Sequence, residues 1–155
     1  MALDIATTMG VVQTHLEGAT DSEGQPLFVE VAIGGPTMAE PDGPSARITA
    51  GPMQVVAVTA HPIELHVVNV LLYRARFTDA EEDRETETAH FVSRVADLFY
   101  GDFSLGGNVR NIDVAGEHGQ PMAVEFTQED VGDAPFHVAT LTLPLVVDSA
   151  TSLVA

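Results

Sequence analysis

The chain contains no cysteine and no lysine, and each absence removes a class of chemistry. Without cysteine there is no disulfide, no thiolate metal site and no thiol nucleophile. Without lysine a phosphate-binding loop that ends in lysine is excluded, and no G-x-S-x-G motif is present either. The sequence has no apolar run near the roughly 20 residues that a membrane helix needs, and no charged-then-apolar leader. We therefore expect a protein that is neither inserted in a membrane nor secreted, and that is made in the cytosol.

Positive charge is also scarce. Acidic residues number 23 against six basic residues, all of them arginine, and the formal net charge is −17. A surface of this sign repels the phosphate backbone, so we expect no nucleic acid ligand. A generic acidic surface that only favours solubility explains the charge equally well. At 155 residues the chain is expected to form one domain, spanning residues 1–155.

The first third of the sequence predicts one helix, one strand and one long loop. Apolar residues recur at helical spacing in residues 2–16, and residues 27–33 alternate as in a half-buried strand with Leu27, Val29, Val31 and Ile33 on one face. Residues 34–52 hold four prolines and four glycines and follow neither period. They predict a long loop that is either a mobile surface segment or a segment that orders against a partner.

The central part predicts a strand pair and a second helix. Residues 53–60 and 63–77 are strand-like, and the stretch 67–72 is apolar on nearly both faces, as in a strand covered on two sides or packed against a neighbouring chain. His66 is expected on the wet face of this strand, with Glu64. Thr78 and Glu81 fit a capping box, and apolar residues follow with a 3.6 period to Tyr100. The acidic run from residue 79 to 85 is then a solvated first turn and not a catalytic cluster.

Three further strands are expected at residues 109–114, 122–126 and 136–147. Because Pro144 has no amide hydrogen, the last strand should lie locally at a sheet edge, or donate outward only from its other residues. The element order predicts the α+β class, with a mostly antiparallel sheet of about six strands and two helices packed on one face.

Catalytic and metal-binding patterns are not found. The six histidines, at positions 15, 61, 66, 90, 118 and 137, never have the i, i+4 spacing of a helical zinc pair. No serine, histidine and aspartate are marked out as a set. We therefore expect no metal, no cofactor and no enzymatic activity. The open alternative of another class is a small acidic α+β protein that binds a ligand or hydrolyses a substrate in a cleft.

Residues 102–112, D-F-S-L-G-G-N-V-R-N-I, place two adjacent glycines between a helix and a strand. Gly101 is expected to end the helix with positive φ, and Gly106 and Gly107 to turn the chain back toward the sheet. That local role explains the glycines but not the whole string. Followed by the strand L-T-L-P-L-V-V, the string resembles the D-x-x-L-G-G-x-V-x-x-[IV] segment of tail terminator proteins of long-tailed, siphovirus-type bacteriophages. The first ten residues also resemble the start of such proteins from phages of high-GC hosts.

The resemblance implies a structural virion protein that is not an enzyme. It implies a homo-hexameric ring on the head-proximal end of the tail tube, which stops tube polymerisation and forms the head-tail joining surface. The implied partners are other copies of the chain, the tail tube protein and the head-tail connector or head completion protein, with no cofactor, no specific nucleic acid binding and no membrane. The implied location is the neck of the virion, after assembly in the host cytoplasm. A related alternative is another neck or head-completion protein.

Five residues are expected at the assembly interface. Met38 and Ile48 are the large apolar residues of the 34–52 stretch and would act as anchors. Arg47 would meet an acidic neighbour, and Arg74 and Arg76 lie on the polar side of the long strand. We expect the loop to be mobile in the free chain and ordered in the ring.

Overall fold

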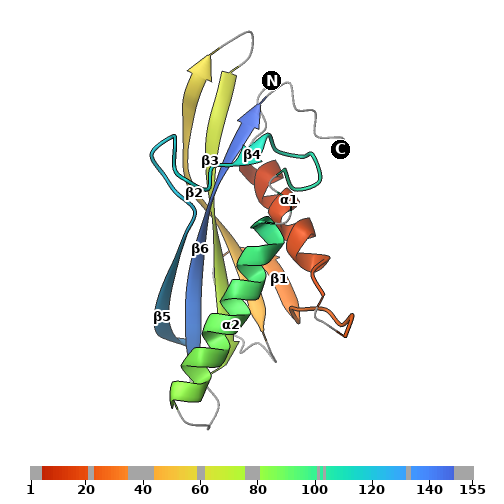
Figure 1. Cartoon of the computed structure of the whole chain (residues 1–155), viewed down its shortest axis with the longest axis vertical. Coiled ribbons are helices and arrows are strands. Elements are labelled where there is room, and N and C mark those ends of the chain that lie inside the picture. The colour runs from red at the N-terminus through yellow and green to blue at the C-terminus, as the bar shows by residue number, and fades with distance from the viewer. Residues whose placement is uncertain are drawn as a thin grey trace.

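A computed structural model describes residues 5–20, 23–34, 44–58, 62–75, 81–100, 102, 104–131 and 134–148. Within these residues it contains two helices and one six-stranded sheet (Figure 1). The elements are α1 (Ile5–Glu17), β1 (Glu30–Ile33), β2 (Ser45–Val58), β3 (Pro62–Ala75), α2 (Glu81–Tyr100), β4 (Asn111–Ile112), β5 (Ala123–Val131) and β6 (Ala134–Asp148).

The sheet is built around three long strands, β2, β3 and β6, which pair antiparallel. β1 joins the outer side of β2 in parallel, so the strand order begins β1-β2-β3-β6. The far side of β6 is shared by two strands: β5 pairs with one half, and the short β4 pairs near its C-terminal end. The α+β class and the mostly antiparallel sheet predicted from the sequence are confirmed.

One face of the sheet carries both helices and the larger core. α1 and α2 touch each other. His15 Nε2 on α1 lies 3.0 Å from the Leu98 carbonyl oxygen on α2, and the His15 ring is tilted by 41° against the Phe99 ring, with centroids 5.2 Å apart. The core below them combines alternate residues of the central strands with apolar residues of the helices: Val12, Leu16, Val68, Val70, Leu72, Val95, Phe99, Leu141, Leu143 and Leu145. The helical period predicted for both segments is confirmed.

The opposite face of the sheet has a smaller cluster of its own. Ile63, Leu65 and Val67 of β3 are buried there with Val146 of β6. The central strand is therefore buried on both faces, as the doubly apolar stretch of β3 predicts.

The long loop expected at residues 34–52 is wrong from residue 45 onward, where β2 begins. Residues 35–43, including Met38, lie outside the described residues. Gly51 and Pro52 fall in a pairing irregularity between Ala50 and Met53, where one extra residue is accommodated as in a β-bulge. A Cβ at Gly51 would lie 2.9 Å from the Val67 carbonyl oxygen, so glycine allows the close approach of the two strands. Two of the eight prolines and glycines that predicted the loop, Gly51 and Pro52, are thus part of a bulge within a strand.

The first strand is shorter than expected, and its apolar face is only partly buried: Leu27 is buried and Val31 packs against the main core. β1 starts at Glu30, and Phe28, which precedes it, packs edge-on against Phe91 of α2. Val29 and Ile33 are 59% and 47% exposed, although alternation placed them on the inner face. β1 is an outer strand paired with β2 alone, so burial falls off across it.

The prediction for Pro144 is confirmed. The Asp113 amide donates to the Pro144 carbonyl, so the backbone groups of residue 144 point away from β3. β5 reaches only to Thr142 and β4 starts at Leu145, which leaves the proline nitrogen opposite the gap between the two strands. No ladder hydrogen bond to β3 is lost.

The remaining strands differ in length from those predicted. The strand expected at 109–114 is reduced to β4, because the flanking residues form turns, while β5 runs on to Val131. The capping box at Thr78 and the helix end at Gly101 lie outside the described residues. None of the helices in the described ranges is long and apolar enough to cross a membrane.

Candidate functional site

The segment that carries the resemblance, residues 102–112, folds as a compact turn between α2 and β4. The Asp102 carboxylate accepts hydrogen bonds from the Gly106 amide, at 2.7 Å, and from the Ser104 hydroxyl. The Gly107 amide is 3.0 Å from the Ser104 hydroxyl oxygen, and the Asn108 side chain donates to the Leu105 carbonyl. These bonds satisfy backbone groups of the turn itself, while the Asp102 amide donates to the Phe99 carbonyl at the end of α2.

Positive backbone angles explain the two adjacent glycines. Gly106 has φ +72° and Gly107 φ +85°, in the left-handed region that glycine enters without strain. Leu105 before them also has a positive φ, of 50°, and its side chain is buried with that of Val109. The expected turn back toward the sheet is confirmed for this pair.

The segment then attaches to the last strand of the sheet. The Arg110 amide donates to the Val146 carbonyl, and Ile112 is buried in the main core. The Arg110 guanidinium lies 3.7 Å from the Asp148 carboxylate at an exposed position. The string therefore links the end of α2 to β6 through backbone bonds and buried side chains.

A second compact turn follows, at residues 113–119. The buried Asp113 carboxylate accepts from the amides of Glu117 and His118, both at 2.9 Å. The His118 carbonyl in turn accepts from the Gln54 side chain of β2, at 3.2 Å. The connection between β4 and β5 is thus held against the β2–β3 hairpin.

A buried polar chain joins α1 to the sheet. His66 on β3 is fully buried, with Nδ1 2.8 Å from the Thr8 hydroxyl oxygen and Nε2 2.7 Å from Glu64 Oε2. Because a carboxylate only accepts, Nε2 carries a hydrogen and donates it. The expectation that His66 lies on a wet face is wrong, since the N-terminal part of α1 covers it.

This chain of Thr8, His66 and Glu64 has the residue types of a nucleophile, base and orienting acid. A catalytic base must reach the proton of a substrate-facing group. Both Thr8 and His66 have no exposed surface, so no substrate can reach them in this conformation. The arrangement is a structural contact between a helix and a strand.

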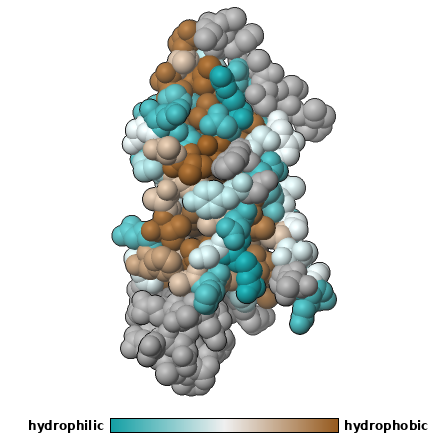
Figure 2. All heavy atoms as spheres, in the orientation of Figure 1, coloured by the Kyte–Doolittle hydropathy of each residue, from teal (hydrophilic) through white to brown (hydrophobic). Residues whose placement is uncertain are grey.

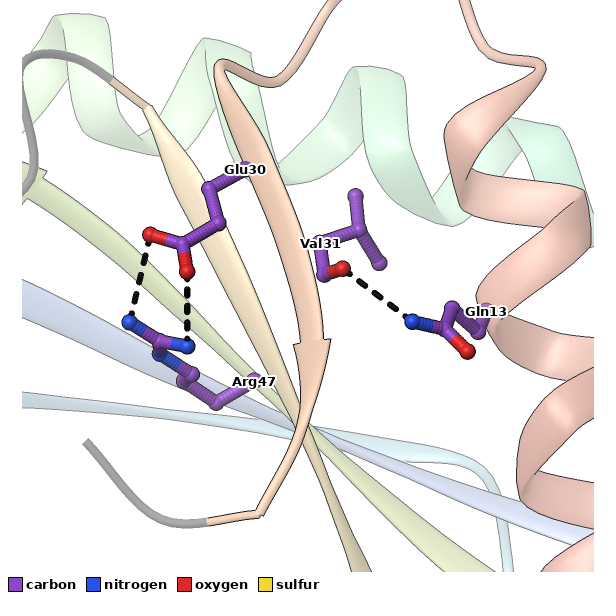
Figure 3. A network of polar contacts seen from close by, with 4 residues as sticks. All are labelled: Gln13, Glu30, Val31 and Arg47. Carbon is purple, nitrogen blue, oxygen red and sulfur yellow. Dashed lines mark hydrogen bonds and ion pairs between the residues drawn. The ribbon is translucent and has the colours of Figure 1, made fainter. Parts of the chain in front are cut away.

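The β1 side of the sheet is held by two polar contacts (Figure 3). Arg47 on β2 pairs with the Glu30 carboxylate through both guanidinium ends, at 3.1 and 3.3 Å. On the outer side of β1, the Gln13 side chain of α1 donates to the Val31 carbonyl at 3.2 Å. α1 therefore occupies part of the edge that β1 would otherwise present.

The residues expected at the assembly interface are not brought together by the described structure. Ile48 is fully buried in the main core, and Arg47 is 4% exposed and paired with Glu30 of its own chain. Neither presents a side chain to a neighbour in this conformation, and both were placed at the surface only because the first half of β2, residues 45–52, was predicted to be a loop. Met38, Arg76 and the side chain of Arg74 lie outside the described residues.

No group of three or more histidine, aspartate or glutamate residues capable of holding a metal ion exists in the described part of the chain. His15 and His66 bond to different partners, and the His118 ring takes part in neither contact. His61 and the side chain of His137 lie outside the described residues.

The surface feature that sequence reasoning missed is the exposed apolar character of the outer strands. Met53, Val55 and Val58 of β2 are 54%, 59% and 77% exposed. Figure 2 shows hydrophobic residues at the surface of the end where β2 and β3 run beyond the helices. The remaining exposed large apolar residues among those described are Val29, Ile33, Tyr100 and Phe126. The signal in the sequence is the uncharged run from Ile48 to Val58 in a strongly acidic chain.

Comparison with known proteins gives one kind of match. No known protein family and no curated protein sequence matches the chain. Among solved structures, the chain is similar to a sheath/tube terminator of an extracellular contractile injection system, PVC, in its extended state, determined by cryo-EM. The TM-score is 0.49 at 10% sequence identity, covering 96% of this chain. The chain spans 57% of the length of that protein.

Proposed function

We propose that this chain is a structural virion protein, a tail terminator that forms a hexameric ring on the head-proximal end of a siphovirus-type phage tail tube. The observation that carries the proposal is the segment 102–112. Its sequence has the D-x-x-L-G-G-x-V-x-x-[IV] pattern, and it lies between a helix and the strand that pairs with β6. Pattern and position together match what the resemblance implies.

The physical properties of the chain suit such a role. A ring of identical subunits closes when each subunit presents one surface to its neighbour and a different surface to the next. The sheet has outer strands on both sides, each with exposed apolar residues, and the helices leave part of them uncovered. On this proposal the partners are other copies, the tail tube protein and the head-tail connector, and the chain needs no cofactor.

The assembly contacts remain a proposal for three of the five predicted residues. Met38, Arg74 and Arg76 would contribute to subunit contacts, with the arginines facing acidic side chains of a neighbour in a chain of net charge −17. Ile48 and Arg47 are assigned to the interior of the subunit instead.

The test is to silence the gene for this chain in the phage that carries it. A terminator is needed to stop tube growth, so tails should become overlong and fail to join heads, and the chain supplied from a plasmid should restore both. Normal tail length with complete head joining would overturn the proposal. Tails of normal length that lack heads would favour the alternative of another neck or head-completion protein.

A further inference from the structure

The turn between β4 and β5 is anchored on the face of the sheet opposite the helices. One anchor is Asp113, whose amide donates to the Pro144 carbonyl of β6, so its side chain lies on the same face as that of Pro144. The other anchor is Gln54 of β2, which pairs with Leu65 and shares its face. Both anchors bond to His118. The Asp113 carboxylate accepts from the His118 amide at 2.9 Å, and the His118 carbonyl accepts from the Gln54 side chain at 3.2 Å.

His118 therefore lies between the two anchors, over the strands that separate them. β6 and β3 lie between β4 and β2 in the sheet, a span of about 14 Å at the usual strand spacing. Leu65 and Val67 of β3 and Val146 of β6 lie on this stretch of the face and are 1%, 3% and 3% exposed. Figure 1 shows the connection leaving β4 and passing to the side of β2 before it continues into β5. The turn thus forms part of the cover of the smaller apolar cluster.

The turn has a closed base and an exposed tip. At the base, the Met122 amide donates to the Val114 carbonyl, and both side chains pack against the main core. The tip, residues 115–120, forms a strap in which every residue except Gly116 is exposed. The strap buries little apolar surface of its own, and hydrogen bonds at Glu117 and His118 hold it down. Segments with few buried apolar contacts open at a low cost in free energy.

Gly116 sets the shape of the closed strap. Its φ is +75°, and a Cβ at this position would lie 2.8 Å from the Pro121 nitrogen. The closed shape therefore has no room for a side chain at residue 116. A substitution there strains the strap from within and leaves β2 untouched.

We propose that the strap is a latched cover, which opens about its base while the rest of the subunit stays folded. Closed, it withholds the apolar cluster of Leu65, Val67 and Val146 from solvent and from association. The latch is the bond from Gln54 to the His118 carbonyl, because this contact ties the tip to β2.

The occupant of this face in the free chain is the strap itself. Opening leaves the pairings of β4 and β5 with β6 in place, since the strap belongs to neither strand. The device is a property of the single subunit, and it holds whether or not the chain is a tail terminator.

Removing the latch is the first test. Gln54→Ala should raise the hydrogen exchange rate of the strap amides at least about tenfold, measured by mass spectrometry. It should also increase the emission of the apolar dye anilinonaphthalene sulfonate, while the midpoint of urea unfolding stays close to that of wild type. Gln120→Ala, which removes an exposed glutamine of the strap itself, is the matched control and should change none of these values.

Two results of this test would overturn the proposal. One is strap exchange and dye emission in Gln54→Ala equal to those of wild type. The other is exchange that rises equally in the strap, β3 and β6, because the whole subunit would then open and the strap would not be a separate unit.

Strain within the strap gives a second variant that leaves the latch residue in place. Gly116→Ala should raise strap exchange and dye emission as Gln54→Ala does, because the added methyl group opposes the closed shape. Wild-type exchange in this variant would show that the closed shape is not under the constraint on which the proposal depends.

A cleavable cross-link then tests whether the dye binds beneath the strap. Because the chain has no native cysteine, Gln54→Cys with His118→Cys can be joined by a bis-methanethiosulfonate reagent. The cross-link should bring strap exchange below the wild-type rate and abolish the added dye emission of Gly116→Ala, and reduction should restore both. Added emission that persists in the cross-linked protein would come from another surface and would overturn the proposal.

Discussion

At the scale of single residues, the string of residues 102–112 is explained almost position by position. Asp102 and Ser104 bond the backbone of the turn, and Leu105 is buried beneath it. Gly106 and Gly107 supply the positive φ angles. These roles are local, within a few residues along the chain, and for that reason the sequence alone predicted the turn.

The two glycines permit a direct test. Gly107→Val should lower the free energy of unfolding by about 1 to 3 kcal/mol, because a β-branched residue is strained at a φ of +85°. A Cβ at this position meets no atom within 4 Å, so the loss arises from the backbone alone. Gly107→Asn should cost less, since asparagine tolerates this region. Equal melting of wild type and the valine variant in urea titration would contradict the strain argument.

His66 shows what the sequence could not predict. Its alternation with Glu64 placed it correctly on a strand but assigned it to solvent. The residue that covers it, Thr8, is 58 positions away in the sequence. Burial by a helix so distant in the sequence cannot be detected in the alternation of apolar and polar residues along the strand.

Removing this histidine should therefore affect stability. His66→Leu fills the space but leaves the Glu64 carboxylate without its donor, and we expect a loss of about 1 to 3 kcal/mol in the free energy of unfolding. His118→Ala, at an exposed position, is the control and should change the value by less than about 0.5 kcal/mol. A His66→Leu protein as stable as wild type in chemical denaturation would show that the buried contacts contribute nothing net.

At the scale of elements, segments with a clear period were predicted well and the segment with punctuating residues was not. α1, α2, β3 and β6 each carry a run of apolar residues at one spacing, and each was found. β2 contains Gly51 and Pro52, which ordinarily indicate a loop, and its bulge is set by the neighbouring strand. Its partner β3 lies after it in the chain, so the sequence of β2 alone could not reveal the pairing.

The revised boundary of β2 changes what a deletion would do. If residues 37–48 formed a surface loop, their removal would leave the subunit folded. Because Ala46 and Ile48 are fully buried, we now expect this deletion to abolish cooperative unfolding by circular dichroism. Deletion of residues 38–41 spares β2 and should retain a two-state transition. A folded protein after the larger deletion would mean that β2 is dispensable to the core.

At the scale of the whole molecule, the order of elements was enough to predict the class but not which edges remain open. Edge exposure depends on which strand covers which part of β2 and β6, and β1, β4 and β5 each cover only a portion. The residues predicted at the assembly interface were the most affected, because their exposure depends on these strand pairings. Arg47 and Ile48 were assigned to the surface although the sheet buries them.

The charge of the whole molecule predicts its behaviour toward nucleic acid. With a net charge of −17, the purified protein should show no binding to duplex DNA at physiological salt in a fluorescence anisotropy titration. The melting temperature should also be unchanged by a chelator, since none of the described residues gather into a metal site. Micromolar DNA affinity would require a basic surface that the composition does not supply.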